Sequence, residues 1–182
     1  GKDIEVICNG FKTDDYLVKI SDLINSGFEN ITPILDNYRE LDKLTESIDR
    51  TFNIGIRIAA EEEPKFEFYT SRLGIGYKDI IPYYSQKIAE HPNARLKMLH
   101  FFINTGIKDT AYYWNELYKC LRVYARLKKI APEVDSLNIG GGFPIKTSLN
   151  FDYDYQYMVN EIVSQIKKFC EEEGVEEPNI YT

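Results

Sequence analysis

Short apolar segments alternate with amphipathic helical segments along the whole chain, and this alternation constrains the fold more than any other feature. Strands are expected in the segments 4–8, 31–35, 54–59, 96–102 and 137–140, with a last strand beginning at 179. Apolar residues at helical spacing predict helices between them. Most strand segments lack polar alternation, as strands buried on both faces do. The pattern therefore predicts a parallel α/β sheet with crossover helices.

The expected helices begin at recognisable capping residues. Thr13 caps the first helix, and Asn37 with Glu40 fits a capping box at the start of the second. The apolar stripe of the second helix is expected to run as far as Phe52, and a further helix is expected over 79–90. These local signals place each helix between two strand segments.

Two architectures fit five β-α units followed by a strand. One is an open, doubly wound sheet, and the other is a β/α barrel, which needs eight strands where six are visible. The first strand starts close to Gly1, and the last begins a few residues before Thr182. Both ends are therefore expected to be cut from something larger. Periodicity alone leaves the choice between the two architectures open.

Composition narrows the classes of function. The 182 residues carry a formal net charge of −7, which disfavours nucleic acid and anionic membranes as partners. No segment reaches the ~18–20 apolar residues of a membrane span, and no signal peptide is visible. Cys8, Cys120 and Cys170 lie in apolar patterns without metal-ligand spacing. We therefore expect buried, reduced thiols, no metal site and a cytoplasmic protein.

Three consecutive glycines follow the fifth strand segment. Gly140, Gly141 and Gly142 come straight after the apolar strand and precede Phe143 and Pro144. Residues without Cβ let the backbone turn sharply and let a ligand approach its N–H groups. Where a strand ends in an α/β protein, that ligand is often a phosphate. A tight turn without a ligand is the alternative, and dinucleotide, Walker-loop, zinc and nucleophile-elbow motifs are missing.

Side chains at other strand ends are further candidates, because ligands of parallel α/β folds bind there. Arg57 lies in an apolar strand and needs a partner, which is either a nearby acid or an anion or ring substituent of a ligand. His100 and Phe102 point to the same side of one strand and would suit a flat ligand. A core histidine is the alternative for His100. Thr105 offers its hydroxyl to a phosphate or, alternatively, to a turn or helix cap.

Five segments carry a family resemblance. They are 7–12 (Ile-Cys-Asn-Gly-Phe-Lys), 56–59 (Ile-Arg-Ile-Ala), 71–75 (Ser-Arg-Leu-Gly-Ile), 99–102 (Leu-His-Phe-Phe) and 137–143 (Leu-Asn-Ile-Gly-Gly-Gly-Phe). In this order they resemble the barrel of the alanine-racemase-like, pyridoxal-phosphate-dependent decarboxylases, most of all the biosynthetic arginine decarboxylases. The resemblance implies a TIM-type (β/α)8 barrel. Residues 1–182 would supply about strands three to eight of a partial pyridoxal-phosphate-binding barrel domain.

The resemblance also implies how the pyridoxal 5'-phosphate cofactor is held. Gly140, Gly141 and Gly142 would donate backbone N–H groups to its phosphate, and Arg57 would line its pocket. Asn138 stands where relatives have an aspartate. No catalytic residue is expected within the chain, because the Schiff-base lysine belongs to an upstream strand. The N-terminal strands and a C-terminal β-domain are likewise expected outside it.

Two alignments are open for the residue that faces the cofactor ring. Relatives place a histidine there, followed by a hydrophobe, a glycine and a serine. In the preferred alignment that histidine falls on Phe102 and the serine on Thr105. In the other alignment it falls on His100. Phe102 would stack on a ring but donate no hydrogen bond.

The implied activity is decarboxylation of arginine to agmatine, a step of polyamine and spermidine biosynthesis. Decarboxylation of diaminopimelate, ornithine or carboxynorspermidine is an alternative, as is a non-catalytic homologue that binds a partner protein. A sugar-phosphate aldolase or isomerase that uses Arg57 and His100 is a third possibility. We expect the intact protein to take a small-molecule amino acid and to form a homo-oligomer, and the isolated chain to be inactive.

Overall fold

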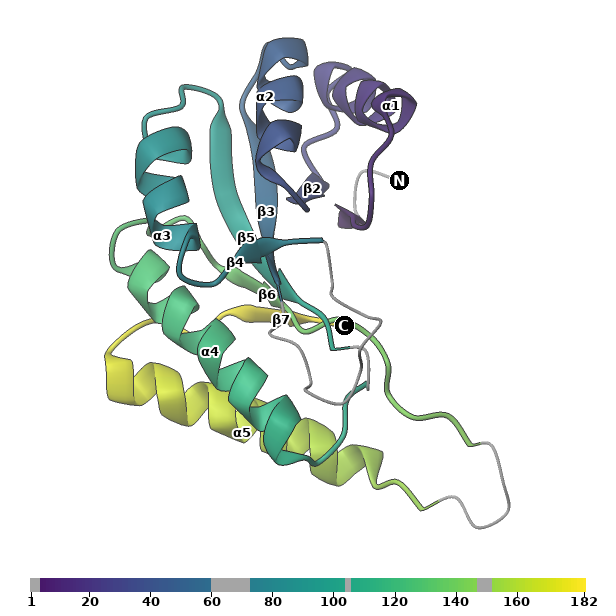
Figure 1. Cartoon of the computed structure of the whole chain (residues 1–182), viewed down its shortest axis with the longest axis vertical. Helices are drawn as coiled ribbons and strands as arrows, with labels where there is room; N and C mark the ends of the chain where they lie inside the picture. The colour runs from purple at the N-terminus through teal and green to yellow at the C-terminus, as the bar shows by residue number, and fades with distance from the viewer. Residues whose placement is uncertain (1–3, 60–72, 104–105, 147–151) are drawn as a thin grey trace.

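The computed structural model describes residues 4–59, 73–103, 106–146 and 152–182. The strands are β1 (Val6–Cys8), β2 (Ile31–Leu35), β3 (Phe52–Ala59), β4 (Ile75–Gly76), β5 (Ala94–Phe101), β6 (Ser136–Asn138) and β7 (Asn179–Tyr181). The helices are α1 (Asp14–Asn25), α2 (Tyr38–Ser47), α3 (Ile80–Tyr83), the π-helical turn η1 (Tyr84–Ile88), α4 (Ala111–Lys128) and α5 (Tyr155–Glu173). Strands and helices alternate as the sequence predicts, with short β4 as an addition (Figure 1).

The described strands form one parallel sheet whose spatial order follows the chain. That order is β1-β2-β3-β5-β6-β7, and β4 pairs with the end of β3. A doubly wound sheet needs one reversal of strand order, and this path has none. Sequential parallel strands joined by helices are the arrangement of a β/α barrel. The structure therefore confirms the barrel-type fold and rules out the open doubly wound sheet.

The sheet is strongly curved. Asn9, directly after β1, lies 3.0 Å from His100 of β5, and Glu5, directly before β1, forms an ion pair with Lys97 of β5. In the sheet β2 and β3 separate β1 from β5, and three strand spacings of a flat sheet span about 14 Å. Side chains meet across that separation only because the sheet curls. Its concave face is thus the interior of a barrel wall.

The central strands bury both faces in two separate apolar layers. The layer that packs against the helices includes Leu35, Ile56, Leu99 and Leu137. On the concave face, Ile34 and Met98 are buried outside that layer. A Cβ at Gly55 would collide with the side chain of Ile34 and come within 3.3 Å of Met98 Cβ. Glycine at position 55 therefore leaves the room that these two larger side chains fill.

The helices form a row along the outer side of the sheet (Figure 1). In this row α1 packs against α2, α3 against α4, and α4 against α5, while α1 and α2 contact β2 and α4 contacts β5. Helices on the outside leave the C-terminal ends of the parallel strands open on the concave side. Ligands of β/α barrels bind at that end.

The predicted caps are present, with one change in the capping box. Thr13 accepts a hydrogen bond from the N–H of Tyr16 at 3.3 Å, and Asn37 accepts one from the N–H of Glu40 at 3.2 Å. The Glu40 carboxylate reaches back past Asn37 and accepts from the N–H of Asp36 at 2.9 Å. Glu40 thus ties the start of α2 to the end of β2.

Two segments differ from the sequence prediction. Phe52 does not belong to the second helix, because α2 ends at Ser47 and extended backbone at Ile48 leads into β3. The helix expected over 79–90 is divided into α3 and η1. In η1 the N–H of Ala89 bonds to the carbonyl of Tyr84, five residues earlier. An extra residue per turn is a tertiary adjustment that α-helical periodicity does not report.

Candidate functional site

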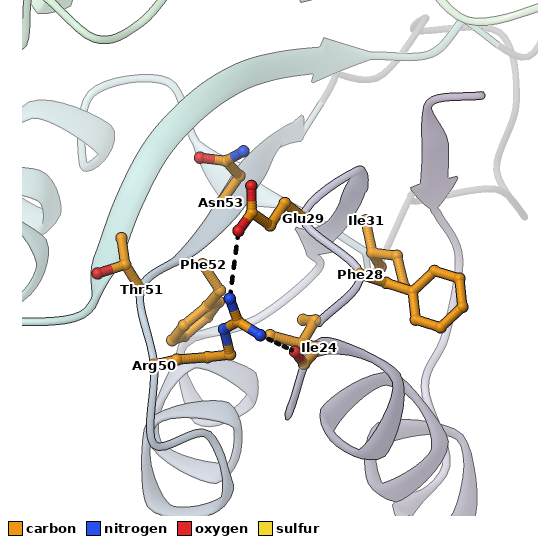
Figure 2. A pocket seen from close by; sticks show the side chains of 8 residues that line it. All are labelled: Ile24, Phe28, Glu29, Ile31, Arg50, Thr51, Phe52 and Asn53. Carbon is orange, nitrogen blue, oxygen red and sulfur yellow. Dashed lines mark hydrogen bonds and ion pairs between the residues drawn. The ribbon is translucent and has the colours of Figure 1, made fainter. Parts of the chain in front are cut away.

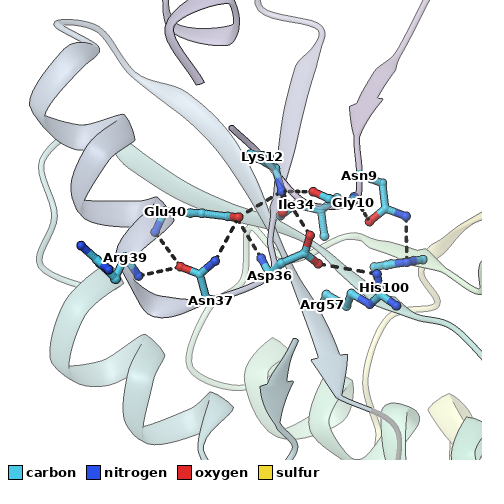
Figure 3. A network of polar contacts seen from close by, with 10 residues as sticks. All are labelled: Asn9, Gly10, Lys12, Ile34, Asp36, Asn37, Arg39, Glu40, Arg57 and His100. Atoms are coloured by element: carbon cyan, nitrogen blue, oxygen red, sulfur yellow. Dashed lines mark hydrogen bonds and ion pairs between the residues drawn. The ribbon is translucent and has the colours of Figure 1, made fainter. Parts of the chain in front are cut away.

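The register of the strands places four polar residues side by side at the C-terminal end of the sheet. His100 of β5 pairs in register with Arg57 of β3 on one side and with Asn138 of β6 on the other. Asp36 directly follows β2 and comes beside Arg57 (Figure 3). Four neighbouring strands thus contribute one residue each to a single row. Two of these residues, Arg57 and His100, were expected at the site from the sequence.

His100 has both ring nitrogens engaged. Nδ1 lies 3.2 Å from the carbonyl oxygen of Asn138, and Nε2 lies 3.0 Å from Nδ2 of Asn9. Burial and, next, the charge of Arg57 lower the pKa of His100 to about 4. In a neutral ring protonated on Nδ1, that nitrogen donates to the carbonyl and Nε2 accepts from the amide. His100 is therefore neutral at pH 7 and fixed in place.

Arg57 and Phe102 lie together beside the glycine loop. The guanidinium carbon of Arg57 is 5.6 Å from the centre of the Phe102 ring, a cation–π distance, and Arg57 also pairs with Asp36 at 3.7 Å. A Cβ at Gly140 would be 3.4 Å from Cδ2 of Phe102. Phe102 is half-buried, whereas His100 is 1% exposed. Of the two ring candidates, Phe102 thus has the accessible aromatic surface.

The glycine run forms a sharp loop directly after β6. Gly140 and Gly142 have φ angles of 72° and 99°. The N–H of Gly140 donates to Oδ1 of Asn138 at 2.8 Å, so an oxygen acceptor at position 138 closes the turn. Within the described part of the chain, no group accepts from the N–H of Gly141 or Gly142, and both residues are exposed. Two adjacent free N–H groups, on residues that have no side chain to block a ligand, fit a phosphate.

A second loop packs directly against the first. The N–H of Ile107 donates to the carbonyl oxygen of Gly142 at 3.0 Å. Gly106 has a φ angle of 77°, and a Cβ there would collide with that same oxygen. Thr105, whose hydroxyl is a candidate phosphate ligand, lies outside the described residues. The contact between Gly106 and Gly142 fixes how closely the two loops approach.

The sequence did not predict Lys12, Asp36 or Glu40 as site residues, although Asp36 belongs to this row and Glu40 was expected in the capping box of the second helix. Lys12 is 4% exposed, and its Nζ lies 3.1 Å from Oε2 of Glu40 and 3.5 Å from Oδ2 of Asp36 (Figure 3). Nζ also donates to the backbone carbonyls of Gly10 and Ile34. We call Lys12, Asp36, Glu40 and Arg57 the ionic cluster. A lysine is almost never buried without a partner. The charged partners of Lys12 come from distant segments of the chain, so its burial could be recognised only in the folded structure.

A cavity of about 510 Å³ opens at the other end of the sheet (Figure 2). It lies where β2 and β3 begin, and Phe28 is part of its lining. Arg50 crosses it, 3.2 Å from Oε1 of Glu29 and 3.5 Å from the carbonyl of Ile24. In β/α barrels this N-terminal end serves stability, and chemistry takes place at the C-terminal end. The row and the glycine loops are therefore the better candidate for a ligand site.

One known family matches nearly the whole chain. The family described as "Pyridoxal-dependent decarboxylase, pyridoxal binding domain" matches residues 5–182. The chain belongs to this family. Its cofactor is therefore pyridoxal phosphate, whose phosphate the free N–H groups of Gly141 and Gly142 fit.

Individual relatives resemble the chain over nearly its whole length. The biosynthetic arginine decarboxylase of Citrifermentans bemidjiense is 25% identical over 195 residues, which cover 99% of this chain and 31% of that protein. The crystal structure of the biosynthetic arginine decarboxylase from Campylobacter jejuni matches with a TM-score of 0.74 and 22% identity, over 100% of this chain and 31% of that chain. The crystal structure of lysine decarboxylase from Selenomonas ruminantium matches with a TM-score of 0.71 and 19% identity, over 97% of this chain and 43% of that chain. The chain thus spans 31% of the length of each of these two arginine decarboxylases, and the two solved structures share its fold.

Three further observations concern expectations from composition. Across the described ranges, no helix is long and apolar enough to cross a membrane. The same ranges contain no group of three or more His, Cys, Asp or Glu residues able to hold a metal ion. Cys8, Cys120 and Cys170 are free and buried, as predicted, and burial raises the pKa of each thiol.

Proposed function

We propose that the intact protein is a pyridoxal-phosphate-dependent decarboxylase that converts arginine to agmatine and carbon dioxide. The observation that supports this most is the pair of free N–H groups of Gly141 and Gly142 at the C-terminal end of a pyridoxal-binding barrel. Arg57 and the ring of Phe102 lie beside that loop. An anion site next to an aromatic surface suits a phosphate ester of a flat ring.

In this proposal each residue holds a different part of the cofactor. Gly141 and Gly142 donate to the phosphate oxygens, as glycine loops do elsewhere. Phe102 packs against the face of the pyridine ring. Arg57 supplies a positive charge at the edge of that surface. Bound pyridoxal phosphate supplies the electron sink for the pair of electrons released when carbon dioxide leaves.

His100 supports the site without moving a proton. A pKa of about 4 leaves its ring neutral at pH 7, and both nitrogens are already engaged. It thereby holds Asn138, whose side chain closes the turn at Gly140. We place the covalent lysine, the partner of the pyridine nitrogen and the substrate-binding β-domain in the parts of the relatives that this chain does not cover. The isolated 182 residues should then lack activity.

Arginine is proposed as the substrate because the arginine decarboxylases resemble the chain over 99% of its length. The low identity leaves room for another basic amino acid, since the lysine decarboxylase shares the fold. Lysine, ornithine, diaminopimelate and carboxynorspermidine are therefore the comparison substrates.

The test is substrate-dependent release of carbon dioxide by the full-length gene product, with and without added pyridoxal phosphate. We expect cofactor-dependent release that is fastest with arginine, accompanied by agmatine. Faster turnover of one of the comparison substrates would reassign the substrate within the family. A protein that binds no pyridoxal phosphate would refute the proposal altogether.

A non-catalytic homologue is the second candidate, and Phe102 favours it. A phenyl ring stacks on a cofactor but donates neither a hydrogen bond nor a proton. A full-length protein that binds pyridoxal phosphate yet releases carbon dioxide from none of the comparison substrates would support this alternative.

A further inference from the structure

Lys12 ends in the interior, where its charge needs compensation. Its side chain is fully buried, and so is that of Asp36. The Nζ group contacts Glu40 at 3.1 Å and Asp36 at 3.5 Å in addition to two backbone carbonyls. A buried ammonium without partners is strongly unfavourable, and removing one member of a buried pair leaves the other uncompensated. Lys12 and the two carboxylates therefore depend on one another.

Asp36 connects this buried pair to the cofactor site. Its Oδ2 faces Lys12 at 3.5 Å, and its Oδ1 faces Arg57 at 3.7 Å. Both oxygens are buried and accept no hydrogen bond from the described residues. Arg57 in turn lies over the ring of Phe102. A continuous path of charge contacts thus runs from Lys12, beyond the end of β1, to the aromatic surface beside the glycine loop.

Glu40 gives Lys12 its place in this path. The Glu40 carboxylate already accepts from the N–H of Asp36 and from the side chain of Asn37. Burial raises the pKa of Glu40, and Lys12 acts against that rise. Two cations therefore balance two carboxylates in the ionic cluster. Without Lys12, Arg57 would face two negative charges alone and be drawn toward them.

We propose that Lys12 and Asp36 are positioning residues of the cofactor site: Lys12 neutralises Glu40, so that Asp36 holds the Arg57 guanidinium over Phe102 and beside the bound cofactor. This inference rests on the proposed function, because it assigns the ionic cluster to the same site. Neither Lys12 nor Asp36 touches the cofactor in this proposal. Both act through Arg57.

The test compares variants of the full-length protein in binding of pyridoxal phosphate. Asp36→Asn and Lys12→Met each remove one charge with little change of shape. Lys12→Met combined with Glu40→Gln removes a cation and an anion together. Lys43→Met is the matched control, because Lys43 pairs with Asp14 at the surface next to the cluster. The readouts are the dissociation constant for pyridoxal phosphate, the circular dichroism that the bound cofactor acquires, and thermal unfolding of the cofactor-free protein.

We expect Asp36→Asn and Lys12→Met to weaken cofactor binding about tenfold or more, the scale of a broken buried charge pair. Both should also change the dichroism of the bound cofactor, because Arg57 leaves its position. The double variant should recover most of the affinity and the wild-type dichroism, and Lys43→Met should change neither. If Lys12→Met does not fold, Asp36→Asn and the double variant still decide the question.

Two results would overturn the inference. One is wild-type affinity and dichroism in Asp36→Asn and Lys12→Met. The other is lowered thermal stability in these variants with no recovery of binding in the double variant, which would make the cluster structural only. A wild-type protein that binds no pyridoxal phosphate is a separate result, because it refutes the proposed function and the positioning role with it.

Discussion

Replacing Gly106 by alanine tests whether the two glycine loops must touch. The added Cβ would collide with the carbonyl oxygen of Gly142, a backbone atom that cannot turn aside as a side chain can. A φ of 77° disfavours an L-residue by about 1 kcal/mol. Loss of the bond from Ile107 to Gly142 removes about 1 kcal/mol, and overpacking adds about 1–3 kcal/mol. We expect Gly106→Ala to lower the free energy of unfolding by about 3–5 kcal/mol in total.

Two other glycines separate these contributions. Gly174 closes α5 with a φ of 65° and has no atom within 4 Å of a built Cβ, so Gly174→Ala carries the backbone strain alone. We expect it to destabilise by about 1 kcal/mol. Gly141 has neither a positive φ nor a neighbour within 4 Å. Gly141→Ala should therefore leave stability unchanged or raise it by up to about 1 kcal/mol.

The assay is urea unfolding of the full-length variants, together with titration by pyridoxal phosphate. Gly106→Ala should be the least stable of the three and should bind the cofactor about tenfold more weakly or worse, because Gly142 is displaced. Equal stability of Gly106→Ala and Gly174→Ala would show that the collision is relieved at no cost. Unchanged cofactor binding by Gly106→Ala would refute the claim that this contact shapes the phosphate site.

Three further predictions address the buried interior. His100 has a pKa of about 4 in the fold and about 6.5 when unfolded, so the unfolded state takes up the proton first. The contribution of neutral His100 to the free energy of unfolding is fully present above pH 6.5, and about 3 kcal/mol of it should be lost as the pH falls toward 4. Urea titrations should not find this loss in His100→Gln. Gly55→Ala should destabilise by about 1–3 kcal/mol, and adding Ile34→Val should restore part of this in the same titrations, since the two side chains compete for one space. The Cys120 thiol should resist a thiol reagent at pH 8 until the protein is unfolded, because burial raises its pKa; rapid labelling of the native protein would contradict its burial.

The candidate site was only partly accessible from the sequence. Gly140–Gly142, Arg57 and Phe102 were expected together because all follow or end parallel strands, and the structure brings them together. The run of three glycines did not show which of their N–H groups would be free to bind a ligand. The side chain of Asn138 accepts a hydrogen bond from the N–H of Gly140. Among the described residues, no group accepts from the N–H groups of Gly141 and Gly142, which are therefore free for a ligand. That division depends on a side-chain rotamer, which composition does not report.

The sequence itself determined the order of strands and helices, the caps at Thr13 and Asn37, and the sharp turn after β6. They depend on neighbours a few residues apart and on periods of 2 and 3.6 residues. The tertiary structure decided which distant residues meet. Lys12 is buried because Glu40, 28 residues later, lies beside it. His100 is neutral because the folded sheet buries it and, next, because the register places Arg57 beside it. Strand register and burial arise from pairing between segments, so they exist only once the sheet has formed.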